Sequence, residues 1–385
     1  MNAFESPFRH LSALADIFPQ ILMAMATTLV VGLLLLGFQH RLSKLARARR
    51  DEEAIQASHV GTPLRLGGIA IFAALATCFL VLGGSGSVVP GLIVISAGPA
   101  VLAGLGEDLG YGISPKGRLA ASFLSAALAV SILGVWVARA DLQGLDLVLG
   151  FKPLAVSLTL LLSAGFCHAT NLVDGMNGLA ATVVISASAG LWILAREAGL
   201  AEVSLITAVL GAAMAGFLIL NWPFGTIFLG DAGSYGVGHV LIWIAIVLVE
   251  RAPAIAAPAM ILILFWPFAD TLHCIARRAA RGSPIFAPDR MHLHQKMRRC
   301  IEIVFLGGAH RRRSNPLATL ALAPMIVVPV IFGVILADDA RAAWMAVVVF
   351  GALFSVTHVA VTRFALRNRC AFKSSKAWRQ LKSGP

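Results

Sequence analysis

The sequence predicts an all-α membrane protein that crosses the bilayer about eleven times. Hydrophobic residues make up 58% of the 385 residues, charged residues make up only 13%, and the mean hydropathy is +0.84. A soluble domain carries roughly twice that charged fraction, whereas a surface that faces lipid needs almost none. The composition therefore excludes the soluble and disordered classes of protein.

Eleven apolar segments are each close to the roughly 20 residues that a helix needs to cross the hydrocarbon layer. The first is too long for the core of a signal peptide and lacks a basic leader, so we expect it to remain as a helix. Glycine, proline or Lys152 interrupts the third and the fifth. In chain order the segments are 16–38, 66–84, 88–105, 119–138, 147–168, 178–195, 203–220, 234–250, 254–274, 316–337 and 342–362.

The basic residues orient these segments. With the N-terminus outside, 25 of the 31 Lys and Arg residues fall on one side of the membrane and six on the other. The positive-inside rule makes the basic side cytoplasmic, and the bias explains the net charge of +12 without a nucleic-acid partner. Binding of these loops to anionic membrane lipids stays open. The cytoplasmic segments are 39–65, 106–118, 169–177, 221–233, 275–315 and the basic tail 363–385.

Five acidic residues lie at the ends of predicted spans, and all five fall on the cytoplasmic side. Carboxylates were not used to orient the helices, so this shared side independently predicts one functional site. Carboxylates at such an edge are suited to hold Mg²⁺ or to take a proton from a phosphate, although a solvated loop acid is the alternative. The five are Glu107, Asp108, Asp174, Asp231 and Asp270.

Two segments combine glycines with polar side chains. Asn171, Asp174 and Asn177 are spaced by three residues, so they share one face if the segment is helical, and they suit hydrogen bonding to a base or a sugar. Residues 230–234 read Gly-Asp-Ala-Gly-Ser ahead of a predicted helix. Free N–H groups there predict a phosphate cradle, with Asp231 carrying a metal ion. A helix cap or a turn is the alternative for both segments.

Two basic segments come later in the chain. Asp270, His273 and Arg277 share a face near the end of the ninth span, where an interfacial charge network is the alternative. The insert 275–315 brings together side chains that suit a pyrophosphate. These are Arg290, His292, His294 and Lys296. The five cysteines are scattered and predict neither a disulfide framework nor a zinc site.

At these residues the chain resembles the polyprenyl-phosphate N-acetylhexosamine-1-phosphate transferase family. That family includes the enzyme that makes the first lipid intermediate of peptidoglycan and the enzymes that initiate O-antigen and related glycans. The matching blocks run in family order from residue 62 to residue 296. They are Thr62-Pro63-x-x-x-Gly67-Gly68, Glu107-Asp108, Asn171-x-x-Asp174-Gly175-x-Asn177-Gly178-Leu179, Asn221-x-Pro223 with Asp231-x-Gly233-Ser234, Asp270-Thr271 and Arg290-x-His292-x-His294.

The resemblance implies that undecaprenyl phosphate attacks the β-phosphate of a UDP-N-acetylamino sugar and releases UMP. It implies Mg²⁺, or Mn²⁺ in its place, and an active site on the cytoplasmic face of the bacterial inner membrane. Residues 1–362 would form one transmembrane catalytic domain, followed by the tail 363–385. The eleventh span and the tail resemble the branch that initiates O-antigen of lipopolysaccharide or other cell-envelope glycans, and a homodimer is compatible with the family.

The resemblance also assigns roles to residues. Asp231 and Asp108 match metal ligands, and Asp108 is the better candidate to deprotonate or orient the lipid phosphate. Three positions depart from the family pattern: Glu107 and Asn177 each replace an Asp, and Gln295 replaces a His. The catalytic set is Glu107, Asp108, Asp231, Arg290, His292 and His294. The substrate-binding set is Asn171, Asp174, Asn177, Asn221, Phe228 and Asp270.

A secondary transporter is the main alternative from another functional class. Transporters also carry intramembrane acids, but their sites lie near the midplane and often between inverted repeats. This sequence has no internal repeat, and its acids gather at one edge. A structural or assembly protein would not need so many polar residues at one interface.

Overall fold

The computed structural model confirms the all-helical fold class. It describes residue 15 and residues 17–45, 63–82, 88–282, 291–306 and 310–374. In chain order the helices are α2 (Phe18–Gly37), α3 (Gln39–Leu45), α4 (Gly67–Leu82), α5 (Val88–Ser96), α6 (Gly98–Asp108), α7 (Pro115–Leu133), α8 (Gln143–Leu149), α9 (Lys152–Val173), α10 (Leu179–Glu197), α11 (Ala201–Asn221), α12 (Gly230–Arg251), α13 (Ala257–Ile263), α14 (Phe265–Ala279), α15 (Leu293–Val304), α16 (Arg311–Ile335) and α17 (Ala340–Ser374).

Most predicted spans correspond to single long helices. Within the described residues, eight helices are long and apolar enough to cross a membrane, namely α2, α7, α9, α10, α11, α12, α16 and α17. Two bent pairs raise this number to ten if each pair is one span: α5 with α6, bent by 42°, and α13 with α14, bent by 85°. The apolar helix α4 has only 16 residues. Each of the eleven predicted segments falls on one of these helices or pairs, while the count of eleven and the orientation stay predictions.

The interrupted segments behave differently from the others. The third predicted span bends between α5 and α6, where Gly98 and Pro99 follow Ala97. The fifth begins later than predicted, because Lys152 starts α9 and the residues before it form the separate helix α8. Helix α6 begins with Gly98-Pro99 and α9 begins with Lys152-Pro153. The N–H groups of the first helical turn have no partner within the helix, so a proline, which lacks an N–H, is tolerated there.

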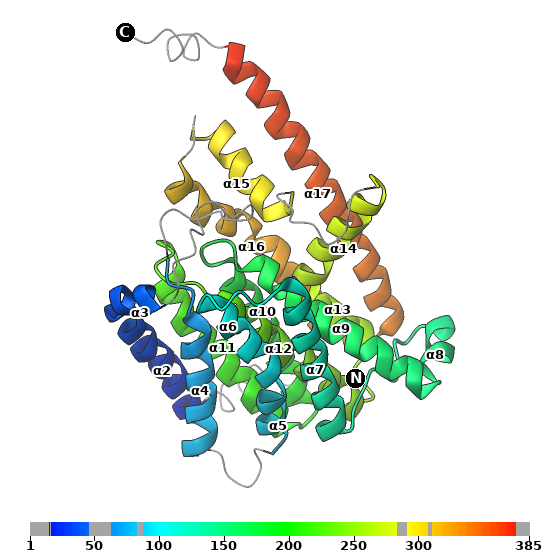
Figure 1. Cartoon of the computed structure of the whole chain (residues 1–385). Helices are drawn as coiled ribbons and strands as arrows, with labels where there is room; N and C mark the ends of the chain where they lie inside the picture. The colour runs from blue at the N-terminus through cyan, green and yellow to red at the C-terminus, as the bar shows by residue number, and fades with distance from the viewer. Residues whose placement is uncertain are drawn as a thin grey trace.

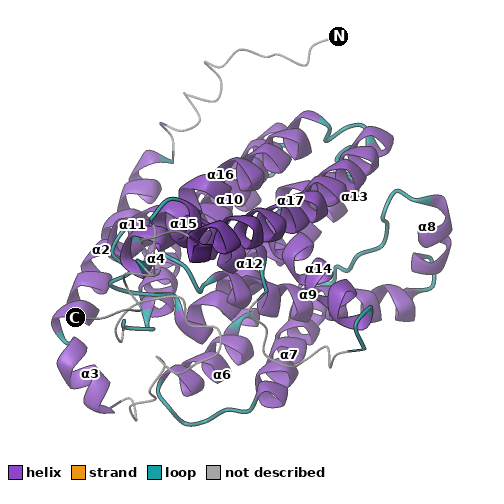
Figure 2. Ribbon diagram, turned by 90° about the horizontal axis from the view of Figure 1, so that it is seen from above, coloured by secondary structure: helices purple, strands orange, loops and turns teal. Residues whose placement is uncertain are grey.

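Helix α12 lies at the centre of the bundle. Of its most apolar 18-residue window, 94% is buried, against 17% for the outer helices α2 and α17. It packs against α9, α6 and α4, and Figure 2 shows it near the middle of the helices when the molecule is seen from above. Figure 1 shows α2 and α3 on one flank and α8 on the other. Because other helices surround it, α12 supplies a rigid frame for the polar residues at its N-terminus.

Glycines allow α4 and α6 to approach the first turn of α12. A Cβ atom on Gly68 would lie 2.3 Å from the Cα atom of Gly233. A Cβ atom on Gly104 would lie 2.5 Å from the backbone nitrogen of Ala232. Small residues at helix contacts serve the same purpose in many membrane proteins, since they let two backbones come close. The position of α6 along α12 therefore depends on Gly104.

Replacing Gly104 with Ala tests this contact. The added methyl group meets backbone atoms of α12 that cannot rotate away, so we expect a loss of about 1–3 kcal/mol of stability from overpacking. The melting temperature of the purified protein measures the change. Gly91→Ala on α5 is the matched control, because a Cβ atom there meets nothing within 4 Å. Equal melting temperatures for the two variants would show that the close approach does not matter.

Candidate active site

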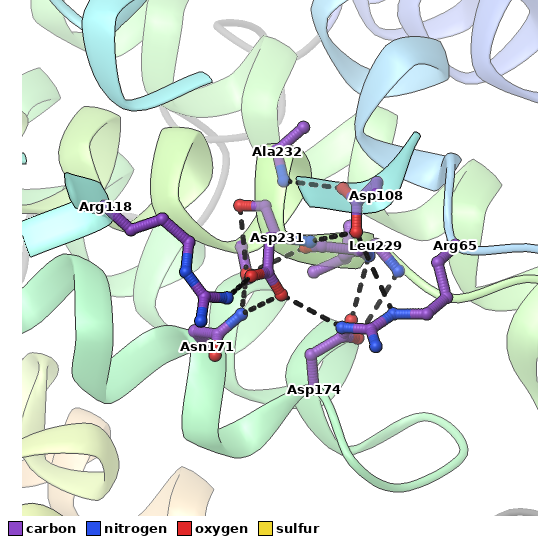
Figure 3. Close-up of polar contacts among 10 residues, drawn as sticks. Arg65, Asp108, Arg118, Asn171, Asp174, Leu229, Asp231 and Ala232 are labelled. Carbon is purple, nitrogen blue, oxygen red and sulfur yellow. Dashed lines mark hydrogen bonds and ion pairs between the residues drawn. The ribbon is translucent and has the colours of Figure 1, made fainter. Parts of the chain in front are cut away.

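Two carboxylates from other helices cap the N-terminus of α12. The first N–H groups of a helix have no partner within the helix. Asp174 accepts hydrogen bonds from Leu229 N at 3.4 Å and from Gly230 N at 3.1 Å. Asp108 accepts from Asp231 N and Ala232 N, both at 2.9 Å, as Figure 3 shows. Four consecutive N–H groups are thus bound by side chains of the protein.

This cap corrects one expectation. Residues 230–234 form the first turn of α12 itself rather than a loop ahead of it. The hydroxyl group of Ser234 donates to Gly230 O at 2.8 Å, so Ser234 is not the N-cap. Because Asp108 and Asp174 bind the N–H groups, the prediction that they are free to cradle a phosphate is wrong.

Asp231 is the centre of a charged cluster. Its carboxylate is almost fully buried and accepts hydrogen bonds from Arg65 Nη2 at 2.9 Å, from Asn171 Nδ2 at 3.0 Å and from Arg118 Nη1. Arg65 Nε also lies 3.9 Å from Asp108 Oδ1. We call these residues the aspartate–arginine cluster, which consists of Arg65, Asp108, Arg118, Asn171, Asp174 and Asp231 (Figure 3). It brings together residues of four loops that the sequence predicted on one side of the membrane.

Backbone pairing fixes Arg65 within this cluster. Leu64 and Ile227 form an isolated parallel bridge, and Phe228 N donates to Leu64 O at 2.8 Å. Two residues further on, Gly67 N donates to Phe228 O at 2.8 Å. The chain around Arg65 is therefore tied to the segment that leads into α12.

The sequence analysis did not assign Arg65 or Arg118 to the site. Arg118 lies in the first turn of α7, where the helix dipole disfavours a cation. A cation in that position is a signal that a nearby anion stabilises it. Arg65 gave no comparable signal, since nothing in its sequence neighbourhood shows the pairing of Leu64 with Ile227.

Asp174 has an unusual protonation equilibrium. Its pKa is raised to about 8, mainly because the surrounding protein removes water from the carboxylate. The charge of Arg65 and the hydrogen bonds from Gly230 and Leu229 lower the pKa only partly. Asp174 can therefore hold or release a proton near neutral pH, as groups in active sites often do.

Asn177 and Asn221 hold loops together. Asn221 donates to Ile227 O at 2.6 Å and accepts from Gly178 N, while Asn177 Nδ2 donates to Pro223 O at 2.7 Å. Helix α9 ends at Val173, so the expected common face of Asn171, Asp174 and Asn177 is wrong. Asn171 and Asp174 point to the aspartate–arginine cluster, whereas the amide of Asn177 supports the following loop. Phe228 is buried, and its backbone forms hydrogen bonds with Leu64 and Gly67 of the segment that precedes α4.

A second polar group, which we call the histidine cluster, consists of Asp270, His292 and His294. Asp270 accepts hydrogen bonds from His292 Nδ1 at 3.0 Å and from Leu293 N at 3.2 Å, and His294 Nδ1 lies 3.6 Å away. The two imidazole rings stack with their centroids 5.5 Å apart. Asp270, which the sequence assigned to substrate binding, here orients the two histidines.

The remaining predicted site residues lie outside these contacts or outside the described residues. In the histidine cluster, burial lowers the pKa of His294 below its usual range. Glu107 is buried next to Asp108 at the end of α6. Arg290 lies outside the described residues. Lys296, which the sequence grouped with the pyrophosphate-binding side chains, is buried and bonds to α17 instead.

The aspartate–arginine cluster offers the oxygen ligands that Mg²⁺ prefers. Oδ2 of Asp231 accepts one hydrogen bond, from Arg118, and keeps a second lone pair, whereas Oδ1 accepts from both Arg65 and Asn171. Asp108 is less suited, because backbone N–H groups bind both of its oxygens. Among the described residues, no group of three or more His, Cys, Asp or Glu side chains is arranged to hold a metal ion by itself. A Mg²⁺ ion at Asp231 would therefore take most of its ligands from water and from a substrate.

Replacing Asp108 with Asn tests the cap on α12. The amide keeps one acceptor oxygen but turns an NH₂ group toward a backbone N–H, so one charge-assisted bond is lost. An unsatisfied buried donor costs about 1–3 kcal/mol, so we expect amide exchange at Asp231 and Ala232 to accelerate about tenfold or more. Hydrogen exchange of a peptide covering residues 228–236 measures this. Asp338→Asn, at an exposed position, is the control, and unchanged exchange in the Asp108 variant would contradict the cap.

Comparisons with known proteins give matches over the part of the chain that contains this site. The profile of glycosyl transferase family 4 matches residues 89–249, which contain Asp108, Arg118, Asn171, Asp174 and Asp231. A decaprenyl-phosphate N-acetylglucosaminephosphotransferase of Mycobacterium tuberculosis is 27% identical over 286 residues, which are 66% of this chain and 68% of that protein.

Two further relatives carry related names. An undecaprenyl-phosphate α-N-acetylglucosaminyl 1-phosphate transferase of Yersinia pestis is 27% identical over 298 residues, covering 73% of this chain and 76% of the relative. A probable undecaprenyl-phosphate N-acetylglucosaminyl 1-phosphate transferase of Bacillus subtilis is 28% identical over 234 residues, covering 60% of this chain and 65% of the relative. These matches support the family of polyprenyl-phosphate N-acetylhexosamine-1-phosphate transferases for this chain, and they indicate a phosphoglycosyl transferase.

Proposed function

We propose that this enzyme transfers an N-acetylamino-sugar 1-phosphate from a UDP-sugar to undecaprenyl phosphate and releases UMP. The names of the relatives supply the class of donor and acceptor. The observation that carries the proposal is the aspartate–arginine cluster, in which two guanidinium groups and three carboxylates meet at the N-terminus of α12. The product, a lipid-linked diphosphate sugar, would initiate O-antigen or another cell-envelope glycan.

The reaction exchanges one phosphate bond for another. An oxygen of the lipid phosphate forms a bond to the β-phosphorus of the donor. The bond from that phosphorus to the bridging oxygen breaks, and UMP leaves with the bonding electrons. Such a transfer needs the two phosphates to be aligned and their negative charge to be neutralised, and it needs little covalent help from the protein.

Arg65 and Arg118 are suited to neutralise that charge. The side chain of Arg65 is 38% exposed and that of Arg118 is 18% exposed, whereas Asp231 between them is 4% exposed. The guanidinium groups are thus held by a buried anion while part of each still faces outward. Arginine can donate two parallel hydrogen bonds to a phosphate, and a donor fixed in advance loses little entropy when the charge develops.

Asp108 and Asp174 take different parts in this proposal. Asp108 and Asp174 each accept two backbone N–H groups, but the carboxylate of Asp108 is only 1% exposed, so we assign Asp108 to orient α12 rather than to remove a proton directly. Asp174 is partly exposed and has a pKa of about 8, which suits a group that exchanges a proton with the lipid phosphate. Asp231 would hold Mg²⁺, which when bound neutralises charge on the donor diphosphate.

The location follows from the substrates. The phosphate of the acceptor lies at the level of the lipid headgroups, and its chain lies in the hydrocarbon layer. A soluble donor must meet it at the membrane edge, where the ends of α6, α9 and the start of α12 come together. We place this edge at the cytoplasmic face of the bacterial inner membrane, because the basic loops lie on that side.

Replacing Asp231 with Asn tests the proposal. The variant keeps the shape of the side chain but removes the charge that holds both guanidinium groups and the metal, so we expect UMP release to fall by about 100-fold or more. The assay uses purified protein with undecaprenyl phosphate, Mg²⁺ and a panel of UDP-N-acetylamino sugars. Asp338→Asn should retain the wild-type rate. Transport of a sugar by the wild type without UMP release from any donor would favour the transporter instead.

Removal of divalent cations tests the metal assignment. We expect EDTA to abolish UMP release, and added Mg²⁺ to restore it, because the donor diphosphate needs a counter-ion beside Asp231. Mn²⁺, which accepts the same oxygen ligands, should restore part of the rate. A rate that EDTA leaves unchanged after extensive dialysis would remove the metal from the proposal while leaving the roles of the arginines intact.

A further inference from the structure

We propose that helix α17 holds the histidine cluster in place through His358, so that the C-terminal helix is a positioning element of the active enzyme. This inference rests on the proposed function and on the prediction from the sequence that His292 and His294 belong to the catalytic set. Helix α17 lies beyond residues 89–249, which the family profile matches. In Figure 1 it runs beside α14 and close to α15, the two helices that carry the histidine cluster.

The first contact fixes the residue that precedes His292. The Nε2 atom of His358 lies 2.9 Å from the backbone oxygen of Met291. A carbonyl oxygen can only accept a hydrogen bond, so Nε2 carries the proton. His358 is 3% exposed, and the bond is therefore shielded from water. Met291 directly precedes His292, so this hydrogen bond links His358 to the backbone next to His292.

The second contact fixes the chain after the histidines. Lys296 Nζ lies 3.1 Å from His358 Nδ1 and donates to Thr362 Oγ1 at 2.8 Å. An ammonium group can only donate, so Nδ1 of His358 accepts, which agrees with a proton on Nε2. Lys296 N also donates to His292 O at 3.1 Å. Both ends of residues 291–296 are thereby attached to α17.

The third contact reaches the helix that carries Asp270. The ring of His273 lies 4.1 Å from the ring of His358, measured between centroids, and His273 Nδ1 lies 3.3 Å from Ser355 Oγ. His273 is three residues after Asp270 on α14, so it lies on the same face. Helix α17 therefore contacts both elements that form the bond between Asp270 and His292, α14 on one side and α15 on the other.

The arrangement has a consequence for catalysis. The bond of 3.0 Å between Asp270 and His292 exists only if α14 and the start of α15 keep their relative positions. A misplacement of about 1 Å in a positioned group can cost about 100-fold in rate. A membrane anchor would need apolar residues alone, whereas α17 buries His358 and binds Lys296 of α15 through the hydroxyl of Thr362.

The decisive experiment compares His358→Phe with His358→Gln. Phenylalanine fills the space but cannot bond to Met291 or Lys296, whereas glutamine offers one donor and one acceptor. We expect the Phe variant to lower the rate of UMP release about tenfold to 100-fold, and the Gln variant to recover most of the rate. His292→Ala, which removes the positioned histidine itself, should show the largest loss. Thr357→Val is the control, since Thr357 is half-buried on α17 and bonds only to Leu353 O among its described contacts.

Hydrogen exchange gives a readout that needs no substrate. In His358→Phe the peptide covering residues 291–300 should exchange faster, while the peptide covering 228–236 should not change. If His358→Phe speeds exchange but the wild type releases no UMP, the positioning role of α17 is supported and the proposed function is overturned. Unchanged exchange at 291–300 would overturn the positioning role of α17. A normal rate of UMP release despite faster exchange would overturn it as well. If the Phe variant does not fold, Lys296→Met and Thr362→Val, which remove single contacts, decide by the same two measurements.

Discussion

The hydrogen bonds from four consecutive N–H groups of α12 to Asp108 and Asp174 hold the site together. They join the last residue of α6 and the residue after α9 to the first turn of the central helix. The N-terminus of a helix carries partial positive charge, which stabilises both carboxylates, and Arg65 Nε lies 3.9 Å from Asp108 as well. The cap thereby places the side chain of Asp231, which belongs to the same turn, between α6, α7 and α9.

The arginines complete the charge balance around this turn. Three carboxylates so close together would repel one another, and the buried Asp231 would be costly without a partner. Arg65 and Arg118 approach Asp231 from two directions and leave part of each guanidinium group exposed. The buried carboxylate of Asp231 therefore fixes the orientation of the two partly exposed guanidinium groups. That division explains why the chain uses arginine, whose planar group bonds to a carboxylate and a phosphate at once.

The sequence was sufficient to predict the spans and the polar residues that meet, because hydropathy and the cost of intramembrane charge act residue by residue. It could not predict how helix ends bond to one another. Asn171 and Asp174 reach the cluster, but Gly178 adopts a left-handed conformation with φ of +78° and redirects the chain after α9. Lys296 lies among residues suited to phosphate, yet its ammonium group bonds to α17. Contacts between segments far apart in sequence leave no local pattern, which is why Arg65 was missed.

Helix α12 also contacts the bend between α5 and α6. A break in a membrane helix is tolerated only where its polar groups find partners. At this bend Ser96 Oγ donates to Ile93 O at 2.8 Å and lies 2.8 Å from Nε2 of His239, a fully buried residue of α12. His239 is eight residues after Asp231, so it lies just over two turns further along α12. The helix that carries Asp231 thus sets the direction of α6 at the bend and binds Asp108 at its end. A shift of α12 would move both points together, so the cap would keep its geometry while the bundle adjusts around it.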